Sequence, residues 1–141
     1  MDSIQAIQKD IIEDFSFLPE WDERYAYLIE LGQKMEPLPE KFRTEENIVR
    51  GCQSTVWLHS ECNGGTVHFK ADSDSLIVKG LAALLMRVFS GQPAVDVLNA
   101  DLLFFEETGL NKHLSSQRTN GLMAMIEEIR AFAKKCQAEE V

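Results

Sequence analysis

Apolar residues recur every three or four positions through the first third of the chain, which predicts two amphipathic helices. Ser3 can cap the first helix and Pro19 ends it, and its apolar face is formed by Ile4, Ile7, Ile11, Ile12, Phe15 and Leu18. Asp22 can cap a second helix, which turns inward the side chains of Tyr25, Leu28, Ile29 and Met35. Residues 37–39, Pro-Leu-Pro, then favour an extended link.

Between positions 49 and 71 the pattern changes to one rich in β-branched and aromatic residues. Residues 55–59 and 66–70 are predicted strands, and Asn-Gly-Gly at 63–65 is typical of a hairpin loop. We expect Ile48 and Val49 to supply a third strand, which completes the smallest antiparallel sheet that is stable. Residues 44–47 are predicted to form one helical turn before the sheet.

Helical periodicity returns after the second strand. Residues 76–90 are apolar on nearly all sides, which predicts a central buried helix with caps available in residues 72–75 and a stop at Gly91. Two short helices are predicted over 93–98 and 101–108, and a last helix starts at Ser115 or Ser116 and ends its apolar stripe at Cys136. A small antiparallel sheet of about three strands between helices predicts an α+β fold.

The length, composition and charge of the chain indicate one domain and argue against one class of partner, the nucleic acids. A chain of 141 residues, 45% of them hydrophobic, predicts a single domain over residues 1–141 with a core of its own. Its 23 acidic and 14 basic residues give a net charge of -9, which argues against nucleic-acid binding. The apolar run at 81–86 is too short to cross a bilayer, and residues 1–4 lack the pattern of a signal peptide.

The three cysteines include no CxxC pair, so we expect no disulfide framework and a reducing, cytoplasmic location. Cys136 lies on the apolar stripe of the last helix, where a small buried hydrophobe is the simplest interpretation. Cys62 lies beside the hairpin turn, and we expect it to be partly exposed, as a resolving or an incidental thiol.

Cys52 has a more distinctive setting, in the run Arg-Gly-Cys-Gln-Ser-Thr before the first strand. A thiol reacts as its thiolate, which a nearby cation or backbone N–H groups favour, and Arg50 and Gly51 can supply them. Gly51 also allows the loop to swing the thiol between a sheltered and an accessible position. The alternatives are a fixed, exposed loop or a packed core cysteine.

A metal site is the main alternative chemistry. Cys52, Cys62, His113 and one carboxylate could bind zinc or an iron–sulfur cluster, although no paired ligand spacing supports it. His113 follows a turn, where a capping or surface role competes with that of a base.

Four blocks of the sequence resemble the SufE family of sulfur-acceptor proteins. They are residues 24–32, residues 47–58 with Gly-Cys-Gln-Ser before a strand, residues 71–81, and residues 113–122. The resemblance runs from about Trp21 to Ile129. It implies a fold similar to that of SufE and of the IscU-type scaffold, without the metal site of the scaffold.

The resemblance also implies a function. A SufE-like protein takes sulfur from the persulfide of a cysteine desulfurase of the SufS or CsdA type, stimulates that enzyme, and passes the sulfur on for iron–sulfur cluster assembly. It acts as a carrier with the desulfurase rather than as a stand-alone enzyme, and the pyridoxal phosphate belongs to the desulfurase. The carrier position here is Cys52. A homodimer is a further expectation, and a metal or iron–sulfur scaffold is the alternative function.

Other residues of the matching blocks are candidates for support or docking. Arg50, Gly51 and Gln53 flank the thiol, and Asp74 either caps the central helix or contacts the partner. His113 and Arg118 could steady the thiolate or meet the partner, although Arg118 could equally pair with a surface carboxylate. Lys79, inside an apolar helix, is expected to keep its ammonium group in water. Where many relatives have Ser-Pro-Ser-Arg, this chain has Ser-Ser-Gln-Arg at 115–118.

Overall fold

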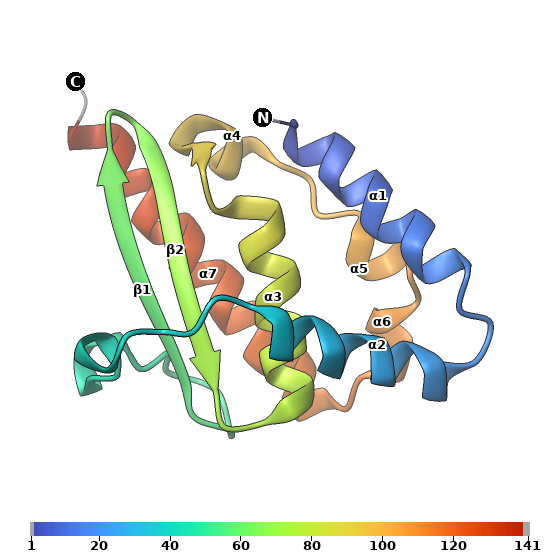
Figure 1. The fold of residues 1–141 in the computed structure, drawn as a ribbon. Helices are drawn as coiled ribbons and strands as arrows, with labels where there is room; N and C mark the ends of the chain where they lie inside the picture. Colours follow the sequence, from blue (N-terminus) through green and yellow to red (C-terminus); the bar gives the residue numbers. More distant parts are fainter. Residues whose placement is uncertain (1, 140–141) are drawn as a thin grey trace.

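In the computed structural model, which describes residues 2–139, helices pack against a three-stranded antiparallel sheet (Figure 1). Strands β1 (Val56–Asn63) and β2 (Thr66–Ser73) pair along their whole length, and β1 forms one edge of the sheet. The hairpin between them confirms the predicted turn, because Gly64 and Gly65 adopt the positive φ angles of 57° and 79° that glycine tolerates. The α+β fold class is therefore confirmed.

The third strand is not the one predicted. Ile48 makes only an isolated bridge to Trp57, whereas β3 (Gln92–Pro93) pairs with the start of β2. Gly91, with φ of 85°, turns the chain back after the central helix, and its N–H donates to the Val67 carbonyl at 2.7 Å. A strand of two residues carries no alternating pattern, so the sequence offered no sign of it.

The first two helices begin close to the predicted positions. Ser3 caps α1 (Ile4–Ser16) by accepting the Ala6 N–H at 3.1 Å, as expected. The predicted cap of the second helix is wrong, because α2 (Trp21–Lys34) begins before Asp22 and Glu20 stands at its N-cap without a side-chain bond. Two 3₁₀ turns, η1 (Glu40–Phe42) and η2 (Glu45–Asn47), lead to the sheet, and η2 confirms the predicted turn.

The central helix α3 (Leu76–Phe89) is buried along most of its length, as predicted, and Ser75 caps it by accepting the Val78 N–H at 3.4 Å. It packs against β2, and α2 crosses its outer side (Figure 1). The crossing is tight because Gly80 lies against the backbone of Leu28, where a methyl group would overlap the Leu28 carbonyl oxygen. Gly80 therefore serves helix packing.

Three short helices connect α3 to the last helix: α4 (Ala94–Asn99), α5 (Phe104–Glu107) and α6 (Leu110–His113), of which α6 was not predicted. The last helix, α7 (Ser116–Glu139), starts as expected, because Ser115 accepts the Arg118 N–H at 3.2 Å. Its buried stripe contacts both long strands of the hairpin. No helix within residues 2–139 is long and apolar enough to cross a membrane.

The expectation that the cysteines stay unpaired is wrong, because Cys62 and Cys136 form a disulfide. Cys62 shares the inward face of β1 with Val56 and Leu58, and Cys136 ends the buried stripe of α7, which lies across that face. Their Cα atoms are 5.6 Å apart, although 74 positions separate them in the sequence. Periodicity located each thiol on its own element, but only the packing of α7 on β1 brought them together.

Candidate functional site

Cys52 lies on a short loop whose two ends are held together at the start of the sheet. The Val49 N–H donates to the Val56 carbonyl at 2.9 Å, which closes the base of the loop. At its tip Gly51 adopts a φ of 94°, a backbone conformation that a residue with a side chain rarely accepts. A hydrogen bond therefore fixes the base of the loop, while Gly51, the residue before Cys52, gives its tip conformational freedom.

A second set of hydrogen bonds fastens Thr55 to the turn between β2 and α3. The Thr55 N–H donates to the Asp74 carboxylate at 3.0 Å, and the Asp74 N–H donates to the Thr55 carbonyl at 3.2 Å. The Ser73 hydroxyl donates to the same carbonyl at 2.9 Å. Asp74 thus anchors the loop, and its predicted role as the cap of the central helix is wrong because Ser75 is the cap.

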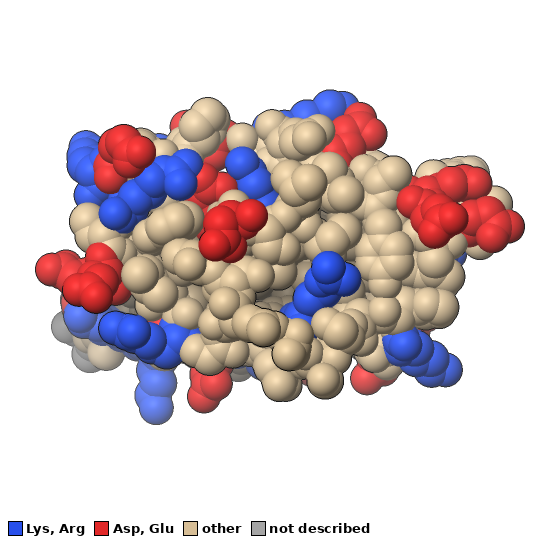
Figure 2. All heavy atoms as spheres, turned by 90° about the horizontal axis from the view of Figure 1, so that it is seen from below, with Lys and Arg blue, Asp and Glu red and all other residues tan. Residues whose placement is uncertain are grey.

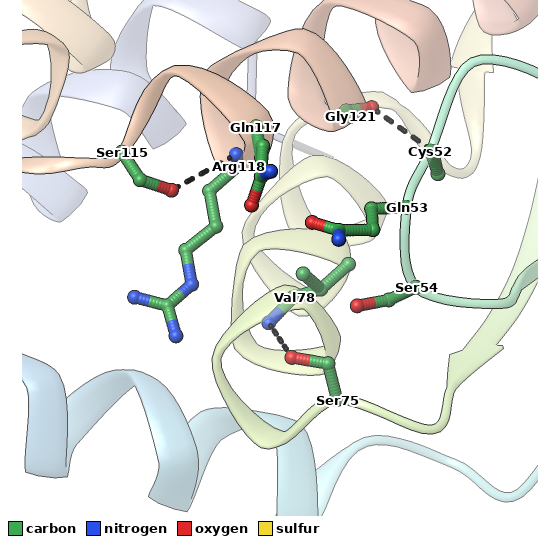
Figure 3. A pocket seen from close by; sticks show the side chains of 9 residues that line it. All are labelled: Cys52, Gln53, Ser54, Ser75, Val78, Ser115, Gln117, Arg118 and Gly121. Atoms are coloured by element: carbon green, nitrogen blue, oxygen red, sulfur yellow. Dashed lines mark hydrogen bonds between the residues drawn. The ribbon is translucent and has the colours of Figure 1, made fainter.

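The thiol of Cys52 is half-buried against α7. Its S–H donates to the Gly121 carbonyl, with 3.6 Å between sulfur and oxygen (Figure 3). A Cβ atom at Gly121 would lie 3.5 Å from the sulfur, so the glycine leaves space beside it. The resting thiol is therefore neither fully buried in the core nor freely exposed. It matches neither of the two alternatives, a packed core cysteine and a fixed, exposed loop.

The electrostatic surroundings keep this thiol protonated rather than activate it. Burial raises the pKa of Cys52 above its ordinary value, and the negative charge of Glu128 raises this pKa further. Arg50, the cation expected to help, is exposed and does not line the pocket beside the sulfur. Activation of the thiol therefore requires a change in its surroundings, such as movement of the loop or the arrival of a partner.

A pocket of about 310 Å³ opens beside the sulfur (Figure 3). It is lined by Cys52, Gln53, Ser54, Ser75, Val78, Ser115, Gln117, Arg118 and Gly121. Arg118 is the one charged residue of this lining, and none of the ion pairs within residues 2–139 includes it. The alternative in which Arg118 pairs with a local carboxylate is therefore not found, and its guanidinium is available to an incoming anion.

The pocket belongs to the end of the molecule where β1 begins, β2 ends and α7 starts, which is the lower end in Figure 1. Figure 2 views the molecule from that side. The hollow near the middle of this face is surrounded mostly by uncharged residues with a basic side chain beside it, while most charged side chains lie towards the periphery. A protein of net charge -9 therefore presents a face with few acidic groups at its centre.

Two further candidates lie outside the pocket. The imidazole of His113 stacks on Trp21, with 3.8 Å between ring centroids, so it does not support the thiol directly. Lys79 is half-buried, and its ammonium group lies 3.2 Å from the buried carboxylate of Asp72, a partner that the sequence did not indicate.

The structure does not assemble the ligand set of the metal alternative. Cys62 is bonded to Cys136, and His113 is stacked on an indole. Within residues 2–139 no group of three or more His, Cys, Asp and Glu side chains is placed to hold a metal ion. The residues that were considered as one site are therefore spread over separate parts of the fold.

Gly121 and Glu128 influence the thiol, yet sequence reasoning gave neither of them a role. They stand seven positions apart in the last helix, a spacing that places two residues on one helical face. This spacing was visible in the sequence. The sequence did not show, however, that this face of the helix contacts Cys52, which is 69 positions from Gly121.

Comparisons with known proteins agree with the fold. The family model SufE, described as an Fe-S metabolism associated domain, matches residues 9–133. An uncharacterized SufE-like protein of Rhizobium meliloti is 46% identical over 129 residues, which span 88% of this chain and 92% of the relative. One of Rhizobium etli is 45% identical over 129 residues, which span 88% and 87%.

The solution structure of a hypothetical protein from Thermus thermophilus superposes on this fold with a TM-score of 0.77 at 27% sequence identity. The match covers 94% of this chain and 96% of that protein. Fold, sequence and the extent of these matches together show that the chain belongs to the SufE family, whose domain is associated with iron–sulfur metabolism.

Proposed function

We propose that this chain accepts sulfur on Cys52 from the persulfide of a pyridoxal-phosphate cysteine desulfurase, stimulates that enzyme, and delivers the sulfur to an iron–sulfur scaffold. The observation that carries the proposal is that Cys52, the free cysteine of the described chain, stands half-buried at the wall of a polar pocket. Membership of the SufE family supports the link with iron–sulfur metabolism.

The proposed transfer is an exchange between sulfur atoms. The Cys52 thiolate attacks the terminal sulfur of the partner's persulfide and forms a new S–S bond. The S–S bond of the partner breaks, and its electron pair leaves with the partner's cysteine as a thiolate. The result is a persulfide on Cys52, and no other oxidant or reductant is consumed.

The resting structure suggests how the transfer is controlled. The raised pKa of Cys52 and its bond to Gly121 disfavour the thiolate while the loop rests against α7. When the loop swings about Gly51, the sulfur leaves the burial and the Glu128 charge that keep it protonated. The side chain of Arg118, which lines the same pocket, can then attract the anionic persulfide. After transfer, return of the loop shelters the cargo from small thiols.

The decisive experiment is intact-mass measurement after incubation of the protein with a cysteine desulfurase, pyridoxal phosphate and cysteine. We expect one or more added sulfur atoms, which peptide mapping places on Cys52. Cys52→Ser protein that is folded, keeps the bond between Cys62 and Cys136 and still binds the desulfurase should take up no sulfur and should not stimulate turnover. If the serine variant stimulates the enzyme as well as the native chain does, the protein is an allosteric activator and the carrier proposal is wrong.

The cellular location and a homodimer stay predictions. Fractionation of cells tests the first, and the molecular mass in solution tests the second.

A further inference from the structure

Two cysteines that the proposed sulfur transfer does not use meet at the opposite end of the sheet from Cys52. Cys62 lies near the end of β1 beside the hairpin, and Cys136 lies near the end of α7 (Figure 1). Gly121, which contacts Cys52, lies fifteen helical positions before Cys136, or about 22 Å at 1.5 Å per residue. Cys62 therefore cannot act as a resolving thiol for Cys52 of the same folded molecule.

We propose that Cys62 and Cys136 form a reversible redox pair, a modification site separate from Cys52. A two-electron oxidant of the peroxide class closes it, a dithiol opens it, and in the closed state Cys52 is the one thiol that can accept sulfur. The first part of this proposal stands on the geometry of the pair. The last part rests on the proposed function of Cys52.

The two sulfurs differ in access, which determines the order of the chemistry. Cys62 is half-buried on an edge strand, whereas Cys136 is 1% exposed. On closing, the Cys62 thiolate attacks one oxygen of the peroxide, the O–O bond breaks, and Cys62 becomes a sulfenic acid while the other oxygen leaves as water. The Cys136 sulfur then attacks the sulfenic sulfur, the S–O bond breaks, and the hydroxyl group leaves as a second water. The two thiols lose two electrons and two protons in total, and one hydrogen peroxide becomes two molecules of water.

Opening also begins at Cys62, the more accessible of the two sulfurs. A thiolate of the dithiol attacks the Cys62 sulfur, the S–S bond breaks, and Cys136 leaves with the electron pair and then takes a proton. The second thiol of the reagent displaces Cys62 and forms the disulfide of the reagent. Since the leaving Cys136 thiolate is formed among apolar side chains, it is a poor leaving group, and we expect slow opening while the protein is folded.

The state of the pair matters for a protein that carries sulfur as a persulfide. With the bond open, Cys62 is a second accessible thiol, which can take sulfur from the desulfurase or remove it from Cys52 of another molecule. With the bond closed, neither sulfur of the pair is a nucleophile. Closing the pair therefore confines the cargo to Cys52.

The redox pair is tested without sulfur transfer by counting thiols in the full-length Cys52→Ser protein. After treatment with hydrogen peroxide, unfolding and addition of N-ethylmaleimide, we expect no labelled cysteine and a mass lower by two hydrogens. After treatment with dithiothreitol before unfolding, we expect two labels. Protein that carries Cys136→Ser in addition, checked for folding by circular dichroism, controls for the reagent and should not lose two hydrogens by forming an internal bond. Two labels after peroxide, or a bond that no dithiol opens, would overturn the proposal.

The confinement of sulfur is tested by loading the same Cys52→Ser protein with a desulfurase, pyridoxal phosphate and cysteine. We expect no bound sulfur on the closed protein and sulfur at Cys62 on the opened protein. Sulfur on the closed protein, or none on the opened one, contradicts confinement. If native protein also fails to load Cys52 while the thiol counts are as expected, the proposed function and the confinement fail together, and the redox pair stands.

Discussion

Reduction of the bond between Cys62 and Cys136 is expected to lower the free energy of unfolding substantially. The bond joins residues 74 positions apart, so it restricts most of the second half of the unfolded chain. In the chain-entropy description, closing a loop of that length removes about 15 cal/mol/K from the unfolded state, or about 4.5 kcal/mol at 25 °C. Because reduction leaves both side chains in place, the comparison of the two forms isolates the crosslink from any change in packing.

Urea unfolding of the oxidised and the reduced protein, followed by circular dichroism, measures this difference. At a slope of about 2 kcal/mol per molar urea, the expected loss moves the unfolding midpoint down by about 2 M. The Cys52→Ser background prevents thiol exchange in the unfolded chain, and alkylation confirms the redox state of each sample. A shift below about 0.5 M between samples of verified redox state would refute the reasoning that the crosslink stabilises mainly through the unfolded chain.

Three further predictions concern the thiol, a helix crossing and a buried carboxylate. Glu128→Gln removes a negative charge that raises the pKa of Cys52, so iodoacetamide should alkylate the folded protein faster near pH 8, and an unchanged rate would contradict this. Gly80→Ala should lower the free energy of unfolding by about 3 kcal/mol through overlap between α2 and α3, and the higher helix propensity of alanine should restore about 1 kcal/mol of it. Thermal unfolding measures the net loss. Burial alone would raise the pKa of Asp72, but a backbone N–H bond and two cations outweigh it and lower this pKa. Its stabilisation should therefore be complete above about pH 5 and decline as the pH falls below about 4, so Asp72→Asn should lose stability at neutral pH and approach the native chain in acid.

Local patterns predicted much of the fold and the position of the loop that holds Cys52. Ser3 caps the first helix as expected, the caps of the central and the last helix fall within the stretches that offered candidates, and the glycines at 64 and 65 turn the predicted hairpin. The loop with Gly51 and Cys52 before the first strand also lies where the residues indicated. These features depend on neighbours within a few positions, so the sequence alone determined them.

The surroundings of the thiol depended on the tertiary structure. Cys52 is shielded by Gly121 and kept protonated with the help of Glu128, both on a helix that begins more than sixty positions later. The bond between Cys62 and Cys136 likewise requires the stripe of that helix to lie on the inner face of the edge strand. Periodicity states which side of an element is apolar, but not which other apolar surface it will meet. The chain by itself therefore specified a cysteine on a glycine loop, whereas packing decided its protonation, its pocket and the pairing of the other two thiols.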